Sequence, residues 1–236
     1  MNLTKITKIT IIIACYNEQN TIQEIVYRIL KAKIGKLKKE IIIINDGSTD
    51  KTSLKLEIFN KYKNIKVVNK IKNEGKGAAI RSAFKLATGG AIIIQDADLE
   101  YNPSEYMQLL EPILSGKADV VYGSRFIGGG PHRVLFYWHR VGNSILTMFS
   151  NMITNLNLTD METCYKVFTR EVAKKVKLYE NRFGFEPEFT IKIAKLRYKI
   201  FEVGISYYGR NYSEGKKISW IDGLHTLYCL IKYGLK

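Results

Sequence analysis

Apolar runs alternate with amphipathic segments through the first half of the chain. Four short runs are predominantly apolar, most of them rich in isoleucine, which is typical of strands buried on both faces. They cover residues 9–14, 41–44, 65–69 and 91–95. Segments with apolar residues at helical spacing separate them, at 21–33, 50–63 and 77–87. This alternation predicts an α/β fold with a parallel sheet covered by helices.

The second half continues the pattern with longer apolar segments. Helices are expected at 102–114, 188–196 and 224–235, and strands at 118–122 and 199–205. An apolar, aromatic-rich segment covers 134–153, after the glycine run 128–130 that predicts a flexible loop. The sequence contains no internal repeat and no clean domain boundary, so its 236 residues predict one α/β domain.

Charge adds an expectation about partners. The chain has 37 Lys and Arg against 22 Asp and Glu, a net charge of +15, which favours an anionic partner such as a phosphorylated substrate or an anionic membrane. A nucleic-acid partner is not expected, since no recognition helix or RNA-binding signature is present. Three widely separated cysteines without a CxxC motif argue against a disulfide framework and favour a reducing compartment. No run approaches the roughly 18 apolar residues of a membrane span, so we expect a cytoplasmic protein.

Polar turns follow three of the predicted strands. They are Tyr16-Asn17-Glu18, the segment 45–50 that contains Asp46, and the pair Asp96 and Asp98. Because parallel strands end at the same edge of a sheet, these side chains are expected to converge. Carboxylates there suit Mg²⁺ or Mn²⁺, although the acidic pair would equally cap the next helix.

A glycine-containing loop precedes the helix expected at 77–87. Lys76 lies between its glycines and is placed to meet an anion at the helix start. The spacing is not that of a Walker A loop, and no GxGxxG follows the first strand. The pattern therefore indicates a nucleotide-type fold without the common nucleotide loops.

The ordered segments IIIACYNE, IIIINDGSTDKT, NEGKGAAIR and IIIQDADLEYNP resemble the family 2 inverting glycosyltransferases of the GT-A fold. Within that family the chain is most similar to the polyprenyl-phosphate branch, typified by dolichol-phosphate mannose synthase. The resemblance continues through VVYGSRF, TDMETCYKVF and FGFEPEFT. It implies a mostly parallel central sheet with amphipathic helices after the acidic pair. It also implies a donor-binding half at about 7–127, an acceptor half at 128–206 and a basic amphipathic tail at 207–236.

The resemblance assigns roles to the donor half. The residues that it places around the nucleotide sugar are Tyr16, Glu18, Asp46, Lys76, Arg81, Asp96, Arg210 and Lys216. Asp96 and Asp98 would form the DXD-type pair that carries Mg²⁺ or Mn²⁺. Glu100 stands where some relatives have a metal-contacting Gln, and its carboxylate would ligate the ion directly. Ala14 replaces the proline that many relatives have before the first polar turn.

The acceptor half carries three arginines, Arg125, Arg133 and Arg140. They are expected to receive an acceptor phosphate, because a guanidinium binds phosphate in bidentate fashion, although Arg133 and Arg140 would equally solvate a helix. The catalytic residues are then Asp98, Arg125 and Arg133. Glu186, Glu188 and Asp160 have open roles, from helix capping to orienting the sugar or acceptor. The tail residues Arg210, Lys216 and Lys217 resemble a loop that clamps the donor diphosphate.

A phosphate acceptor is anionic at neutral pH, whereas an alcohol acceptor needs a general base. The arginines favour a phosphate acceptor, and the resemblance implies metal-dependent transfer of mannose or glucose, from GDP-mannose or UDP-glucose, to a polyprenyl phosphate. The alternative is an alcohol acceptor in surface glycan or glycolipid synthesis, with Asp160 or Glu186 as base. Segment 134–153, Trp220 and the last helix are expected at a membrane face, the alternatives being a core helix or a dimer interface. A membrane-anchored partner protein stays an open alternative.

Overall fold

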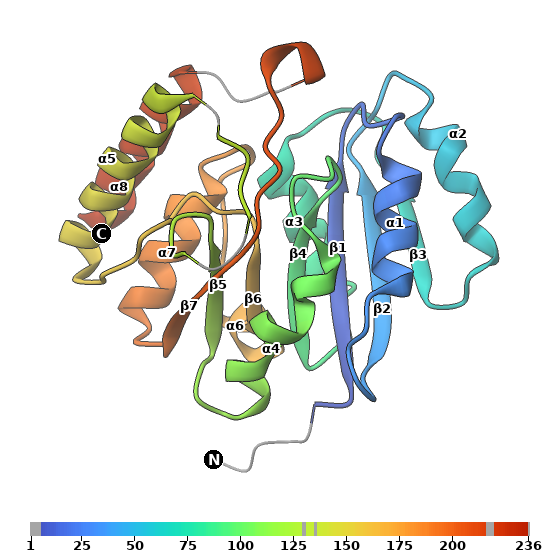
Figure 1. The fold of residues 1–236 in the computed structure, drawn as a ribbon, viewed down its shortest axis with the longest axis horizontal. Coiled ribbons are helices and arrows are strands. Elements are labelled where there is room, and N and C mark those ends of the chain that lie inside the picture. Colours follow the sequence, from blue (N-terminus) through green and yellow to red (C-terminus); the bar gives the residue numbers. More distant parts are fainter. Residues whose placement is uncertain (1–5, 129–130, 135, 216–219, 236) are drawn as a thin grey trace.

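A seven-stranded sheet with helices on both faces forms the centre of the structure (Figure 1). The structure is a computed structural model and describes residues 6–128, 131–134, 136–215 and 220–235. The strands are β1 (Lys8–Cys15), β2 (Lys38–Asn45), β3 (Ile65–Asn69), β4 (Ala91–Asp96), β5 (Val120–Ser124), β6 (Lys166–Thr169) and β7 (Ile200–Gly204). The α-helices are α1 (Ile22–Lys31), α2 (Thr52–Leu56), α3 (Lys76–Phe84), α4 (Tyr106–Leu114), α5 (Tyr137–Thr154), α6 (Arg170–Lys175), α7 (Phe185–Lys195) and α8 (Trp220–Gly234). Three 3₁₀ turns are η1 (Glu57–Lys61), η2 (Pro103–Glu105) and η3 (Tyr212–Glu214).

The strand order places a topological switch point beside β1. The order is β3-β2-β1-β4-β6-β5-β7, and β1 pairs in parallel with both β2 and β4. The first three strands of the chain extend from β1 to one side, and β4 then pairs with the other side of β1. In the register, Ala14 of β1 lies opposite Ile44 of β2 and Asp96 of β4. Ligands of such sheets bind outside the carboxyl ends of the strands at this point.

The core consists of two layers because successive strand residues point to opposite faces. Ile11 and Ile13 of β1 pack with buried residues of α1 and α4 on one face. Ile12 packs with α3 and α7 on the other face. All three isoleucines have no exposed surface. This two-sided burial explains the continuously apolar strands.

The expected α/β fold is confirmed, with two differences in its elements. The helix expected at 50–63 is α2 followed by the 3₁₀ turn η1, because a continued α-helix would bring the exposed Lys63 to the buried face. The tighter turn places Tyr62 against Phe59, with ring centres 6.1 Å apart. Strand β6 and helix α6 were not expected. β6 runs antiparallel to both neighbours and contains a buried lysine, Lys166, which hides its strand pattern.

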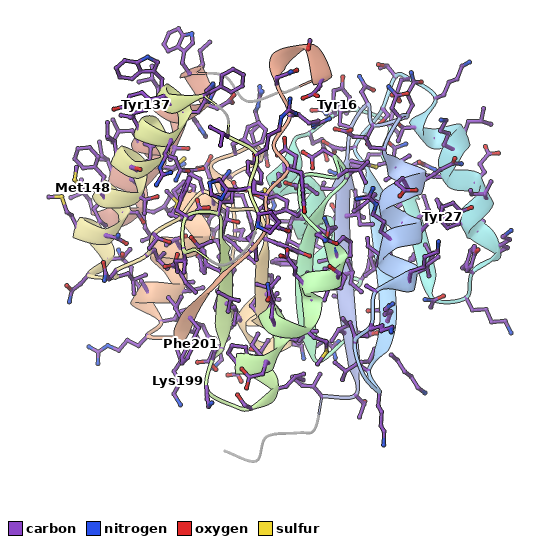
Figure 2. The ribbon with its side chains drawn as sticks, in the orientation of Figure 1. Tyr16, Tyr27, Tyr137, Met148, Lys199 and Phe201 are labelled. Carbon is purple, nitrogen blue, oxygen red and sulfur yellow. The ribbon has the colours of Figure 1, made fainter. Side chains whose placement is uncertain are left out.

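Helices α5 and α8 lie side by side at one end of the molecule (Figure 1). The side chain of Ile153 on α5 packs against the backbone of Gly234 on α8, where a Cβ atom would lie 2.7 Å from Cγ2 of Ile153. Large apolar side chains remain exposed on both helices, namely Tyr137, Trp138, Ile145, Met148, Met152, Trp220, Ile221, Leu224, Tyr228 and Ile231. Tyr137 and Met148 point away from the rest of the protein (Figure 2). Within the described ranges, no helix is long and apolar enough to cross a bilayer.

The alternative of an ordinary core helix at 134–153 is therefore wrong. The buried residues of α5 are Thr147 and Ser150, both polar, and most of its large apolar side chains are exposed, although Leu146 packs against the core.

Candidate active site at the carboxyl edge of the sheet

The turns after β1 and β2 lock together at the carboxyl edge of the sheet. The backbone N–H of Asn17 donates to Oγ of Ser48 at 2.9 Å, and Oδ1 of Asn17 accepts from the backbone N–H of Thr49 at 2.8 Å. Asn17 has a φ of 51°, a left-handed conformation that asparagine tolerates better than most residues. Tyr16 is half-buried in the same turn, at the end of the molecule opposite Lys199 and Phe201 (Figure 2).

Asp46 connects the turn after β2 to the glycine loop before α3. Its Oδ2 accepts from the backbone N–H groups of Gly75 at 2.6 Å and Glu74 at 3.1 Å. Its Oδ1 lies 3.0 Å from Nζ of Lys70. The next residue, Gly47, has a φ of +69°, and a Cβ there would lie 2.4 Å from the carbonyl carbon of Lys72. The expected polar turns thus meet, and Asp46 positions the loop that carries Lys76.

Three carboxylates converge on one arginine at the mouth of the switch point. Nη2 of Arg210 lies 3.1 Å from Oδ2 of Asp98, and Nη1 lies 3.4 Å from Oε2 of Glu18. Glu100 accepts from the backbone N–H of Arg210 at 2.8 Å and from the hydroxyl of Tyr207 at 2.9 Å. All three carboxylates are at most 15% exposed. The basic tail therefore reaches back over the acidic edge.

Asp96 has a separate cation. Its Oδ1 lies 3.0 Å from Nζ of Lys76, which is also 3.4 Å from Oε1 of Glu186 and in contact with Sγ of Cys164. Burial opposes the charge on Asp96, but Lys76, Cys164 and Lys166 together outweigh it and hold the pKa of that carboxyl below its ordinary value. The lysine of the glycine loop thus faces the acidic pair.

The charge of this edge favours a divalent cation. Burial, together with the neighbouring Asp96 and Glu100 carboxylates, raises the pKa of Asp98 to about 8. Burial is the larger cause, and the part due to Asp96 and Glu100 shows that like charges repel at this edge although Arg210 opposes the effect. The donor atoms of Asp96, Asp98 and Glu100 are all carboxylate oxygens, which Mg²⁺ and Mn²⁺ prefer. The residues therefore fit the ion that the sequence predicts.

Arg125 lies in a buried ion pair at the end of β5. Asp160, which is fully buried, accepts from Nε of Arg125 at 2.6 Å, from Nη2 at 2.7 Å and from the backbone N–H at 3.1 Å. Nη2 also donates to Oδ1 of Asn143 at 3.2 Å. Both oxygens of Asp160 are thus engaged, and the guanidinium of Arg125 also lies 5.2 Å from the ring centre of Tyr207.

The remaining basic residues are spread more widely. Nη1 of Arg133 donates to Oε2 of Glu214 at 2.7 Å and to the carbonyl of Gly209 at 3.1 Å. Arg140 lies on α5 with its guanidinium 5.2 Å from the ring centre of Phe126. Nη1 of Arg81 donates at 2.5 Å to the carbonyl of Glu180, in the loop before α7. Lys216 and Lys217 lie outside the described residues.

Sequence reasoning missed a buried polar layer behind the acidic pair. Lys166 donates to the carbonyls of Met161 and Thr163, and its ammonium lies 4.8 Å from the ring centre of Tyr122. Burial and the neighbouring Glu186 raise the pKa of Glu162 to about 8. The only sequence signal was the charged residues inside the otherwise apolar stretch 161–168.

Comparison with known proteins identifies the family to which this edge belongs. The model of the family described as Glycosyl transferase family 2 matches residues 10–177, which include the three polar turns and the buried layer. The chain belongs to glycosyl transferase family 2. The expectation of a glycosyltransferase is thereby confirmed at the level of the family.

Two curated relatives of this family 2 chain have names that state an acceptor. One is a dolichol-phosphate mannosyltransferase of Pyrococcus furiosus, 30% identical over 96% of this chain and 64% of the relative. Another is a dolichyl-phosphate β-glucosyltransferase of Trichomonas vaginalis, 27% identical over 92% of this chain and 69% of the relative. The chain therefore spans about two thirds of the length of these relatives.

A solved structure confirms the expected fold. It is the glucosyl-3-phosphoglycerate synthase of Mycobacterium tuberculosis, in complex with Mn²⁺, UDP and phosphoglyceric acid. The TM-score is 0.75 at 17% identity, over 97% of this chain and 78% of that chain. The family 2 chain thus has the fold of a nucleotide-sugar glycosyltransferase.

Proposed function

We propose that this family 2 chain transfers a hexose, mannose or glucose, from a nucleotide-diphosphate sugar to a polyprenyl phosphate with inversion. The observation that carries the proposal is the position of three carboxylates at the switch point, with Asp96 paired to Lys76 and with Asp98 and Glu100 paired to Arg210. Two relatives, named for transfer of mannose and of glucose to a dolichol phosphate, support the acceptor and the type of sugar.

Asp96, Asp98 and Glu100 would hold Mg²⁺ or Mn²⁺ in the donor site. When bound, such an ion supplies Lewis-acid stabilisation of the departing nucleoside diphosphate. The Mn²⁺ complexes of the structural neighbour support a divalent ion. Lys76 and Arg210 already face the acidic side chains, so both are placed to contact the diphosphate oxygens.

Glu18 and Asp46 would contact the nucleoside from the turns after β1 and β2, with Tyr16 beside them. The hydrogen bonds that Asp46 accepts from the glycine loop keep the two sides of this pocket in register. Arg81 is directed to the loop before α7, and we therefore assign it a positioning role behind Lys76.

The acceptor would approach from α5. A shallow groove of about 300 Å³, largely open to solvent, lies on the outer face of α5 and is lined by residues of that helix such as Tyr137, Val141, Ile145 and Met148. Arg140 lines the same groove. An apolar groove with one guanidinium matches a prenyl chain that ends in a phosphate. The apolar side chains would contact the prenyl chain, and the guanidinium would bind the phosphate.

The exposed faces of α5 and α8 would then lie at the cytoplasmic face of a membrane. An amphipathic helix with aromatic residues on its apolar side buries that side at the boundary between head groups and acyl chains. The net charge of +15 would add attraction to anionic lipids. This peripheral placement delivers a membrane-embedded acceptor to the groove.

The chemistry of a phosphate acceptor requires positioning and charge compensation rather than deprotonation. Arg125, Arg133 and Arg140 would compensate the acceptor charge. Asp160 does not suit a general base, because both of its oxygens are engaged by Arg125.

One observation favours an alcohol acceptor as a second candidate. Among the described residues, Oε2 of Glu186 is buried and has no hydrogen-bond partner, and Glu186 is 2% exposed. A free carboxylate oxygen beside Lys76 is placed either to orient a sugar hydroxyl or to remove a proton. Glu186→Gln separates these roles, because a general base is required for turnover but not for donor binding.

The experiment is a transfer assay that crosses GDP-mannose and UDP-glucose with a polyprenyl phosphate and the corresponding polyprenol, in Mg²⁺ or Mn²⁺. We expect transfer to the phosphate only, and loss of transfer in Asp98→Asn. Glu111→Gln, which changes an exposed carboxylate on α4, is the matched control and should keep full activity. Transfer to the polyprenol but not to its phosphate would refute the proposal and support the alternative.

A further inference from the structure

Three side chains with metal-ligating atoms converge where α8 packs on the loop before α7. They are Glu180 in that loop and His225 and Cys229 on α8, four residues apart on one helix face. Nε2 of His225 lies 3.6 Å from Oε2 of Glu180 and 3.9 Å from Sγ of Cys229. All three ligand atoms lie within 4.8 Å of one another. None of these residues belongs to the acidic edge that would hold the donor.

A glycine leaves the space in which these side chains meet. A Cβ atom at Gly184 would lie 2.8 Å from Sγ of Cys229, 2.9 Å from Cε1 of His225 and 3.0 Å from Cγ of Glu180. The φ of Gly184 is −65°, which any residue adopts. The glycine is therefore not needed for the backbone conformation. What it provides is room at the point on which the three ligands converge.

The carboxylate of Glu180 is oriented by partners on one of its oxygens. Oε1 accepts from the hydroxyl of Tyr233 at 2.7 Å and from Nζ of Lys232 at 2.8 Å. The backbone N–H of Glu180 donates to Oε2 of Glu188 at 2.8 Å, which fixes the loop. Oε2 of Glu180 is thereby left facing His225. Metal-binding carboxylates are commonly held in this way by hydrogen bonds to the non-ligating oxygen.

We infer that Glu180, His225 and Cys229 form a zinc site with a fourth position open to solvent. Tetrahedral bonds of about 2.3 Å to sulfur and about 2.0–2.2 Å to nitrogen and oxygen place ligand atoms roughly 3.3–3.6 Å apart. The observed separations of 3.6 and 3.9 Å need to close by only a few tenths of an ångström. The side chain of His225 is 42% exposed, which leaves a path for the ion and a place for a water ligand.

The type of ligand separates this site from the acidic edge. Imidazole and thiolate are softer than carboxylate and select zinc over Mg²⁺, whereas the acidic edge offers oxygen atoms alone. Burial and the neighbouring Glu180 raise the pKa of Cys229 to about 12, so the free thiol is not a nucleophile at neutral pH. A bound cation would displace its proton. The ammonium of Lys232 would repel a cation here. That side chain is 32% exposed, however, so it can move away from the ion into solvent.

Zinc at this point would brace the donor half of the molecule. The carbonyl of Glu180 accepts from Nη1 of Arg81 at 2.5 Å, and the carbonyl of Asn181 accepts from the backbone N–H of Ala78 at 3.1 Å. Both donors belong to α3, the helix that begins at Lys76. The ion would therefore join α8 to the loop on which the start of α3 rests.

The test is a metal titration of the metal-free, full-length protein in excess Mg²⁺, which saturates hard oxygen sites. Co²⁺ is the optical probe, and Zn²⁺ is then measured by competition. We expect one Co²⁺ with a thiolate-to-cobalt charge-transfer band, displaced by one Zn²⁺. His225→Ala and Cys229→Ser should each weaken zinc binding about 100-fold or more, and Tyr233→Phe, which removes only the orienting hydroxyl, about tenfold.

His132→Ala changes a histidine outside the cluster and is the matched control, with unchanged affinity. Because Cys229 is buried, circular dichroism first checks that its variant folds. If the Cys229 variant does not fold, the His225→Ala variant is the one that decides, since His225 is half-exposed. A protein without the thiolate band, or a His225→Ala variant that binds zinc as tightly as the original, would overturn the inference. The cluster would then be an ion pair between His225 and Glu180.

Discussion

The buried ion pair between Arg125 and Asp160 allows a quantitative test of the structure. Asp160→Ala removes the acceptor of four hydrogen bonds, two from the guanidinium of Arg125, one from its backbone N–H and one from Nδ2 of Asn143. The Arg125 side chain is only 16% exposed, so its charge would remain largely buried without that partner. Removal of one partner from a buried pair costs about 3–5 kcal/mol of the free energy of unfolding.

Urea denaturation followed by circular dichroism measures this cost. With an m-value of about 3 kcal/mol/M, the midpoint should fall by roughly 1–1.7 M. Glu24→Ala is the control, since it breaks the ion pair between Nε of Arg28 and Oε1 of Glu24, which are 2.8 Å apart. Both of these side chains are about half exposed. That change should cost less than about 1 kcal/mol. Equal losses in the two variants would refute the reasoning from burial.

A double variant separates the structural role of Arg125 from its proposed role at the acceptor phosphate. Arg125→Met with Asp160→Leu removes both charges, and the free energy of unfolding should recover most of what Asp160→Ala loses. If Arg125 also compensates the acceptor phosphate, this stable variant has a raised KM for the acceptor and an unchanged affinity for the donor. Full activity in a stable double variant would contradict the acceptor role.

Three further predictions concern a turn, a titration and a surface. Gly47→Ala should lower the free energy of unfolding by about 2–3 kcal/mol, because Gly47 has a left-handed φ and a Cβ there would meet the backbone of Lys72. Gly35→Ala is the control and should cost about 1 kcal/mol, since Gly35 has a φ of +61° but no atom lies within 4 Å of its Cβ position. Thermal unfolding compares the two variants. Burial opposes ionisation of Glu40, but hydrogen bonds from two threonines and the charge of Lys8 outweigh it and lower its pKa. The stabilisation from Glu40 is thus present above its ordinary pKa of 4.5 and lost as the pH falls through the folded value. In Glu40→Gln the urea midpoint should depend less on pH below 4.5, and an unchanged dependence would contradict the assignment. Trp138→Ser with Met148→Ser, at side chains 77% and 50% exposed, should weaken sedimentation with anionic vesicles by about tenfold or more at an unchanged urea midpoint, and equal binding would exclude α5 as a membrane-facing surface.

The periodicity of the sequence predicts the donor half of the fold well, because burial on both faces leaves its strands continuously apolar. Strand β6 was not predicted from the apolar pattern. It is four residues long and contains Lys166, whose ammonium is satisfied by two carbonyls and the face of Tyr122. Only the folded chain brings those partners together, so no local pattern signals the strand.

The candidate site divides in the same way. Asp96 and Asp98 follow a recognisable strand, and the parallel arrangement alone brings them to the edge where Glu18 and Asp46 also end. The ion pair of Arg125 with Asp160 joins residues 35 positions apart and was not expected, since pairing between distant charges depends on packing that periodicity does not describe. The sequence therefore indicates where the charges gather but not which of them neutralise one another.

The distribution of charge at the edge supports a ligand that brings both signs together. Asp98, Glu18 and Glu100 share the guanidinium of Arg210, and Asp96 shares the ammonium of Lys76 with Glu186. A cation alone would compete with Arg210 for the carboxylates and leave that guanidinium buried without a partner. A phosphate alone would draw Arg210 away and leave the carboxylates uncompensated. A diphosphate with a divalent ion satisfies both sets at once, because the ion takes the carboxylates and the phosphate oxygens take the arginine and the lysine.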